Sequence, residues 1–294
     1  MNNNEKNKPL DIAEIDRFAM RTAFEKAATS YDAAAVLQQE VANRLVERMD
    51  YMSMKPVSIL DAGAGTGFIS QRLASRYPKA KITGLDLAFN MLKQAKSKRS
   101  LKQRWNKQFN YINAEVENIP LADASVNLVI SGLTLQWCQD LTKVFKEFRR
   151  ILAPDGLLLF STFGPDTLKE LRQSWAKVDE LAHVNAFTDM HDVGDALMQS
   201  GFADPVMDME MLTMTYEDVK TVMRDLKQIG AHNVMQGRSH TMTGKNKLKN
   251  MMHAYEQFRD DGLLPVSYEI VYGHAWVPEE KNIDSAVVVP FQKF

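Results

Sequence analysis

Three glycines at alternate positions, Gly63, Gly65 and Gly67, lie between two carboxylates, Asp61 and Asp86. Glycine has no Cβ, so a glycine loop can approach a ligand closely and adopt positive φ angles. An aspartate that ends the following strand can accept hydrogen bonds from both hydroxyls of a ribose. The spacing therefore predicts a loop that binds a nucleoside-containing cofactor.

The charge beside this loop indicates which cofactor it binds. The nicotinamide fingerprint, Gly-x-Gly-x-x-Gly, holds a pyrophosphate at a helix amino terminus. Here the spacing is Gly-x-Gly-x-Gly, and Asp61 lies two residues before the first glycine. A carboxylate in that position would repel a pyrophosphate and attract a cation. S-adenosylmethionine carries a sulfonium and an ammonium, and the charge therefore favours it as the cofactor.

The elements that must position this loop form an alternating series. Apolar strand patterns cover 57–60, 81–85, 109–113, 126–131 and 156–163, and helical patterns separate most of them. The unbroken apolar run at 157–160 is typical of a strand that is buried on both faces, as in a parallel sheet. This series predicts a doubly wound, Rossmann-like α/β sheet, with the glycine loop at the carboxyl ends of its strands.

Helical segments flank the predicted sheet. A helical pattern covers 11–49, and after residue 163 the sequence predicts helices over 166–181 and 191–200 and strands over 206–215 and 266–276. About fifty mostly helical residues separate these two strands, and we expect them to fold over the sheet edge as a lid before the last strand.

We expect one domain over 10–277. It divides into a helical cap (10–50), a cofactor-binding core (51–165) and a substrate-side half (166–277) with the lid at about 216–264. Residues 1–9 read as a disordered tail, and residues 278–294 as a tail of unknown role.

Composition excludes several classes of function. The chain has 294 residues, a formal net charge of -1, one cysteine and six histidines. The near-neutral charge does not favour nucleic acid or an anionic membrane as a partner. The histidines show no metal-ligand spacing, and no apolar run is long enough to cross a bilayer. We expect a cytoplasmic protein without a metal.

A second motif supports the cofactor prediction. Residues 114–121, Ala-Glu-Val-Glu-Asn-Ile-Pro-Leu, resemble the class I methyltransferase segment whose acidic residue binds the adenine amino group, and that position is Glu115. The other residues predicted to contact the cofactor lie within these motifs or in the neighbouring elements; they are Ala64, Leu87, Met91, Val116 and Ser131.

Four other segments resemble the malonyl-acyl-carrier-protein O-methyltransferases of biotin synthesis, the BioC family. They are 24–32 (FEKAATSYD), 133–138 (LTLQWC), 226–231 (LKQIGA) with the following Gly237-Arg238, and 264–269 (LPVSYE). The resemblance spans about 18–276. The chain departs from the family at Ala64, where a cysteine or another small residue is common, and at Glu115, where an aspartate is common.

The resemblance implies methyl transfer to the free carboxylate of malonyl-acyl carrier protein, giving the methyl ester that primes pimeloyl synthesis for biotin. A malonyl carboxylate is ionised at neutral pH, so no general base is required. Positioning is then the main catalytic contribution. Tyr31 is the predicted catalytic residue, closing the pocket from the amino-terminal segment. The predicted substrate-binding residues are Phe24, Gln136, Trp137, Arg224, Lys227 and Arg238.

A basic run is a candidate docking surface for the acidic acyl carrier protein, although a solvated face is the commoner explanation for such a run. Its members are Lys93, Lys96, Lys98, Arg99, Lys102, Arg104 and Lys107. Three other functions remain open from the sequence. One is methylation of another small substrate, such as a quinone precursor. A second is that of a methyltransferase-like complex I assembly factor linked to protein hydroxylation. The third is that of a cofactor-binding scaffold without catalytic turnover.

Overall fold

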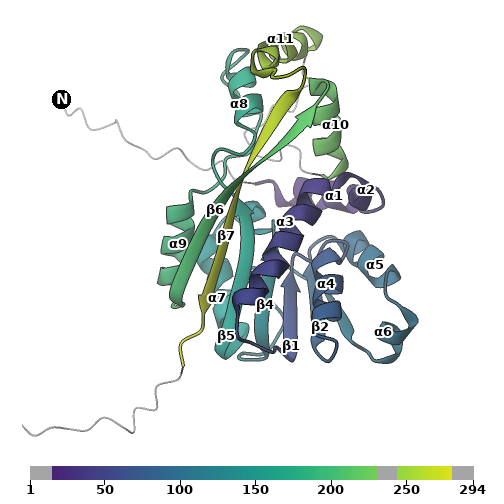
Figure 1. Cartoon of the computed structure of the whole chain (residues 1–294), viewed down its shortest axis with the longest axis vertical. Coiled ribbons are helices and arrows are strands. Elements are labelled where there is room, and N and C mark those ends of the chain that lie inside the picture. The colour runs from purple at the N-terminus through teal and green to yellow at the C-terminus, as the bar shows by residue number, and fades with distance from the viewer. Residues whose placement is uncertain (1–14, 231–243, 280–294) are drawn as a thin grey trace, which may run out of the picture.

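A seven-stranded sheet of order β3-β2-β1-β4-β5-β7-β6 forms the centre of the computed structural model, which describes residues 15–230 and 244–279 (Figure 1). The first five strands are parallel, and β7 runs antiparallel between β5 and β6. The strands are β1 (Ser58–Ala62), β2 (Lys81–Asp86), β3 (Phe109–Asn113), β4 (Val126–Gly132), β5 (Leu152–Phe163), β6 (Ala203–Tyr216) and β7 (Leu264–Trp276).

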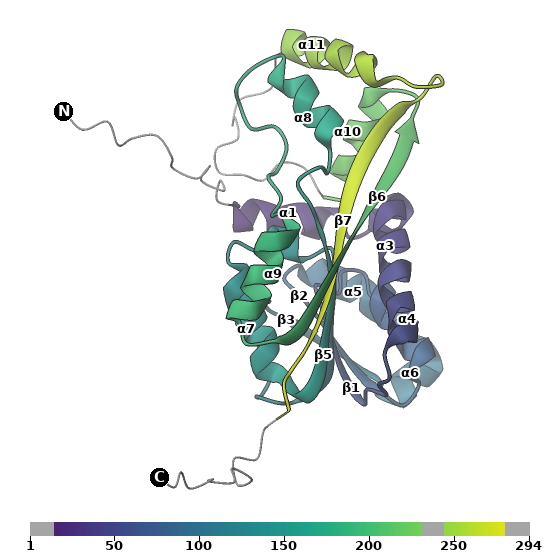
Figure 2. The same ribbon diagram turned by 60° about the vertical axis from the view of Figure 1, so that its left-hand side comes forward.

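Helices cover both faces of this sheet, as the doubly wound prediction requires. Figure 2 shows α3 and α4 on one face and α7 and α9 on the other. The helices of the core and its amino-terminal segment are α1 (Arg17–Ala27), α2 (Tyr31–Ala34), α3 (Val36–Glu47), α4 (Phe68–Arg76), α5 (Phe89–Ser97), α6 (Leu101–Trp105), α7 (Leu141–Ile151) and α9 (Met190–Gln199). Short 3₁₀ helices are η1 (Arg48–Tyr51) and η2 (Leu135–Trp137).

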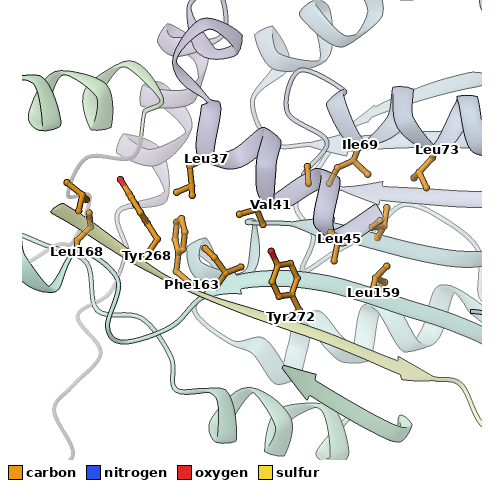
Figure 3. Packing of buried hydrophobic residues seen from close by; sticks show 14 of the residues in the cluster. Leu37, Val41, Leu45, Ile69, Leu73, Leu159, Phe163, Leu168, Tyr268 and Tyr272 are labelled. Atoms are coloured by element: carbon orange, nitrogen blue, oxygen red, sulfur yellow. The ribbon is translucent and has the colours of Figure 1, made fainter. Parts of the chain in front are cut away.

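The apolar runs of the strands supply both faces of the core. Leu157 and Leu158 are adjacent on β5 and both fully buried, yet they belong to different apolar clusters on opposite sides of the sheet. Neighbouring strand residues point to opposite faces, so a strand covered twice must be apolar at each position. Figure 3 shows Leu37, Val41 and Leu45, spaced four residues apart on α3, directed into the first of these clusters.

The last two strands extend beyond the core into a helical upper part (Figure 1). They pair from Ala203↔Trp276 to Tyr216↔Leu264, and this pairing places the intervening helices at the far end of the ribbon. These helices are α10 (Val219–Gln228), α11 (Lys245–Tyr255) and η3 (Glu256–Phe258), joined there by α8 (Lys169–Ala176) from before β6. The predicted lid and its place before the last strand are therefore confirmed.

One predicted helix, over 166–181, is wrong at both ends, because α8 covers only Lys169–Ala176. It begins late because Leu168 lies at φ 58°, in the left-handed region, which a right-handed helix cannot include. Beyond Ala176 the chain turns away, and Leu181 is left 45% exposed. The predicted tail at 1–9, and most of the one at 278–294, lie outside the described residues.

Candidate active site

The glycine loop connects β1 to α4 through three left-handed residues. Gly63, Gly65 and Gly67 have φ angles of 77°, 53° and 81°. The amides of Gly63 and Ala64 donate to the carbonyl of Leu85 at 2.8 and 2.9 Å, which ties the loop to the end of β2. A Cβ on Gly63 would lie 1.9 Å from Thr134 Oγ1, whereas a Cβ on Gly65 would meet nothing within 4 Å. A glycine is thus required at Gly63 because Thr134 packs against it, whereas Gly65 faces open space.

Asp61 is the penultimate residue of β1, just before this loop, and is fully buried. Its Oδ2 accepts a 2.5 Å hydrogen bond from Ser70 Oγ, while Oδ1 has no partner within the described residues. Burial raises the pKa of this carboxyl to about 7, and the Ser70 hydrogen bond opposes the shift. A buried carboxylate that lacks one partner is costly unless a cation compensates it. This site therefore fits a cationic ligand.

Asp86 lies at the end of β2, on the other side of the loop. Its two oxygens accept 2.8 Å hydrogen bonds from the amides of Gly65 and Ala88. Burial raises its pKa to about 6. Each carboxylate oxygen has a second lone pair, so these bonds fix the carboxylate and leave it able to accept from ribose hydroxyls.

Glu115 lines a small cavity with a mostly apolar wall, called here the Glu115 cavity. Its lining includes Arg17, Met20, Leu87, Ala114, Glu115, Val116, Glu117, Thr134, Trp137 and Cys138. Arg17 of α1 donates to Glu115 at 3.0 Å and to both oxygens of Glu117 at 2.5 and 2.6 Å. Three residues predicted to contact the cofactor, Leu87, Glu115 and Val116, thus share one cavity.

Tyr31 and the glycine loop line a second space, the glycine-loop cavity. Its lining includes Tyr31, Asp32, Ala35, Gln38, Gln39, Gly63, Ala64, Gly65, Thr66 and Leu133. Burial, with Asp86 as the next cause, raises the pKa of the Tyr31 phenol, so it stays protonated at neutral pH. Thr66 Oγ1 donates to Asp32 Oδ1 at 2.5 Å, which joins the loop to α2.

A larger cavity of about 220 Å³, the central cavity, lies between the core and the upper helices. Its wall is mainly aromatic and aliphatic; it is formed by Gln38, Trp137, Phe163, Thr167, Leu168, Leu171, Trp175, His183, Val184, Asn185, Phe187, Met223, Leu226, Ile229 and Tyr268. Sequence reasoning identified only Trp137 among these, since side chains from seven separate segments form the wall.

Two side chains each belong to the walls of two cavities. Gln38 lines both the central and the glycine-loop cavities, and Trp137 lines both the central and the Glu115 cavities. Phe24 of α1 packs edge-on against Trp137, with ring centroids 5.4 Å apart and an interplanar angle of 87°. The central cavity is therefore adjacent to both the glycine-loop cavity and the Glu115 cavity.

Several predicted residues lie outside the three cavity walls. Gln136 uses its amide within the fold, donating to the Leu133 carbonyl at 2.7 Å. Ser131 is fully buried and donates to the Ala62 carbonyl at 2.9 Å, and Met91 is buried against Ala27, Ala28 and Ala88. Arg224 and Lys227 are exposed on α10. Arg238 lies outside the described residues.

The basic run is spread over α5, α6 and the turn that follows. Lys98 donates to the Thr66 carbonyl of the glycine loop at 3.0 Å and pairs with Asp32. At the other end, the Lys107 carbonyl accepts from Lys81, the first residue of β2, at 3.1 Å. The run thus extends from the predicted cofactor site to the opposite end of the sheet.

Two further findings concern the part of the chain that the structure describes. There, no group of three His, Cys, Asp or Glu side chains is arranged to hold a metal ion. In residues 15–230 and 244–279, no helix has the length and apolar character that a membrane span requires.

The sheet order, the glycine loop and Asp86 define a class I S-adenosylmethionine-dependent methyltransferase. A family profile described as a methyltransferase domain matches residues 60–160. Among solved structures, the YcgJ protein of Bacillus subtilis has a TM-score of 0.57 at 13% identity, with 80% of this chain and 98% of that chain covered. A Haemonchus contortus phosphoethanolamine N-methyltransferase 2, solved with S-adenosylhomocysteine, has a TM-score of 0.50 at 18% identity, covering 81% of this chain and 53% of the other. These likenesses show the fold.

Sequence relatives define the family more narrowly. The malonyl-[acyl-carrier protein] O-methyltransferase of Gallionella capsiferriformans is 51% identical over 281 residues, covering 94% of this chain and 96% of the relative. That of Nitrosospira multiformis is 49% identical, covering 91% of each. The chain belongs to the malonyl-[acyl-carrier protein] O-methyltransferase family. This assignment confirms the resemblance seen in the sequence and sets aside the hydroxylase-linked assembly factor.

Proposed function

We propose that this protein transfers the methyl group of S-adenosylmethionine to the free carboxylate of malonyl-acyl carrier protein, the ester-forming step that primes pimeloyl synthesis for biotin. The observation that carries the proposal is that the central cavity shares a wall residue with each cofactor-side cavity, Gln38 with one and Trp137 with the other. Reactants placed in these cavities would be neighbours across these two side chains. Family membership supplies the identity of the acceptor.

The donor would lie along the carboxyl ends of β1, β2 and β3. When bound, S-adenosylmethionine supplies a methyl group on a positively charged sulfur. Asp86 would accept from the ribose hydroxyls, since two backbone amides already fix its carboxylate. Glu115 would accept from the adenine amino group within the Glu115 cavity, next to Leu87 and Val116. Gly65 would give the methionine part close access to the backbone.

Asp61 would compensate the positive charge of the donor from beneath the loop. Its carboxylate is buried and its Oδ1 has no described partner, so a nearby cation would favour the ionised form. The neighbouring residues Gly63, Ala64 and Gly67 shape the turn above it.

The malonyl thioester would occupy the central cavity, whose apolar wall excludes water from the reacting carboxylate. Tyr31 and Phe24 would close the reaction site from the amino-terminal segment, with the Tyr31 hydroxyl directed to the methyl group. On this proposal, residues 51–165 would bind the donor, and residues 166–277 would carry most of the acceptor wall.

The direct test incubates the purified protein with S-adenosylmethionine carrying a labelled methyl group and with malonyl-acyl carrier protein. We expect label in a methyl ester on the malonyl group. Acetyl-acyl carrier protein, which lacks the second carboxylate, is the matched control and should remain unlabelled. Label appearing equally with the acetyl thioester, or absent with the malonyl thioester, would contradict the proposal.

A further inference from the structure

The acceptor's carboxylate needs hydrogen-bond donors where it meets the methyl group, and those that the wall of the central cavity offers are almost all neutral. Among the described residues of that wall, none is a lysine or an arginine. His183 is the one group there that can carry a positive charge. Its Nε2 is already paired with Asp179 Oδ1 at 2.7 Å, and its ring stacks on Trp175 at 3.7 Å.

Gln38 and Trp137 are the two polar side chains of this wall that also line a cofactor-side cavity. Both are half-buried. Within the described residues, neither the Gln38 amide nor the Trp137 indole N–H has a hydrogen-bond partner. The adjacent Gln39 differs, because its amide donates to the Asp32 carbonyl at 2.9 Å. Two uncommitted neutral donors therefore lie on walls that the central cavity shares with the cofactor-side cavities.

We infer that Gln38 Nε2 and Trp137 Nε1 bind and orient the malonyl carboxylate for attack on the methyl group. This inference rests on the proposed function and identifies the subsite that recognises the acceptor's charge. An oxygen of the carboxylate forms a bond to the methyl carbon while the carbon–sulfur bond breaks and its electron pair stays on sulfur. An anion and a sulfonium cation become two neutral products, and no proton moves.

Neutral donors suit this charge change better than a lysine or arginine would. A fixed cation would stabilise the carboxylate before reaction and would then lie unpaired beside a neutral ester. It would also repel the sulfonium. An amide N–H and an indole N–H hold the carboxylate oxygen by hydrogen bonds without adding a formal charge. These hydrogen bonds are weaker to the neutral ester product than to the anion. Product release then follows from the loss of charge.

The test uses three variants of the full-length protein and one matched control. Gln38→Met keeps the length of the side chain and removes its donors, Gln38→Glu places a negative charge at the same point, and Trp137→Phe keeps an aromatic ring without the N–H. The control is Gln199→Met, an identical exchange at an exposed position on α9. Urea midpoints establish that each variant is folded.

The first readout is binding, independent of turnover: calorimetric Kd for malonyl-pantetheine and for acetyl-pantetheine, each with S-adenosylhomocysteine present. We expect Gln38→Met and Trp137→Phe to weaken malonyl-pantetheine binding by about 10- to 100-fold, the usual loss for a hydrogen bond to a charged group. Acetyl-pantetheine binding should be unchanged. Gln38→Glu should weaken malonyl binding further and leave affinity for the cationic S-adenosylmethionine equal or higher.

The second readout is the KM for malonyl-acyl carrier protein, which should rise in parallel while the KM for S-adenosylmethionine stays constant. Malonyl binding by Gln38→Met equal to that of Gln199→Met would overturn the inference, as would an equal loss for the acetyl compound. A parent protein that binds malonyl-pantetheine but forms no ester would instead overturn the proposed function, which keeps the two failures distinguishable.

Discussion

Replacing Gly63 with alanine should damage the fold, whereas the same change at Gly65 should damage mainly cofactor binding. Both residues have left-handed φ angles, of 77° and 53°, so alanine costs about 1–2 kcal/mol at either position. The two positions differ in the space around the added methyl group. At Gly63 the Cβ would lie 1.9 Å from Thr134 Oγ1 and 2.5 Å from its Cγ2, and at Gly65 it would meet nothing within 4 Å.

The clash at Gly63 forces Thr134 to move. Its hydroxyl lies 3.3 Å from the Ala62 carbonyl and 3.2 Å from that of Gly132, so moving it also disturbs the ends of β1 and β4. Overpacking of this kind costs about 1–3 kcal/mol. The free energy of unfolding should therefore fall by about 2–5 kcal/mol in Gly63→Ala and by about 1–2 kcal/mol in Gly65→Ala.

Urea denaturation of the two ligand-free variants measures the difference in the free energy of unfolding, and calorimetry with S-adenosylhomocysteine measures the loss of cofactor binding. We expect the larger loss of affinity per unit of lost stability in Gly65→Ala, since its methyl group enters the open space of the loop. Thr134→Ala removes the two nearest atoms, so Gly63→Ala should cost less in that background. Equal losses of stability at Gly63 and Gly65, or no coupling to Thr134, would refute the steric argument.

Three further predictions concern charge. Burial raises the folded-state pKa of Asp61 from 3.8 to about 7, so the free energy of unfolding of the ligand-free protein should fall as pH rises through this interval. Urea titrations at several pH values measure this pH dependence, and Asp61→Asn should reduce it. An unchanged pH dependence in the variant would contradict the assignment. Arg17→Met should lower the free energy of unfolding by about 1–3 kcal/mol and weaken S-adenosylhomocysteine binding, because buried Glu117 loses its main partner. The matched change Arg21→Met breaks a partly exposed 3.9 Å pair and should change the free energy of unfolding by under about 0.5 kcal/mol. Similar losses in both variants would contradict the role given to Arg17. If the basic run docks the carrier protein, charge reversal there should raise the KM for malonyl-acyl carrier protein at low salt and leave the KM for malonyl-pantetheine unchanged. A KM for malonyl-acyl carrier protein equal to that of the parent protein would indicate a solvated face. The positions to reverse are Lys102, Arg104 and Lys107.

The donor half of the site could be predicted from sequence because it is local. Gly63, Gly65 and Gly67 need positive φ, which restricts the residue type, and Asp86 follows from its place at the end of an apolar strand. Strand β3 lies at the predicted residues, 109–113. The alternation of strands and helices along the sequence then predicted the doubly wound sheet.

The acceptor half could not be predicted in the same way. Gln38 is an ordinary polar residue on an amphipathic helix, and its meaning comes from where α3 packs relative to the glycine loop. Arg224 and Lys227 are plausible carboxylate ligands by residue type, but α10 presents Met223 and Leu226 to the central cavity instead. Helix orientation decides such questions, and only tertiary packing fixes it.

The long β6–β7 ribbon has a consequence for how this enzyme can diversify. It carries α10 and α11 on a support that is separate from the glycine loop, so we expect exchanges at Met223 or Leu226 to alter the shape of the central cavity more than the proposed donor site. A library confined to 216–264 should therefore yield proteins that accept different acyl groups yet retain the parental affinity for S-adenosylhomocysteine.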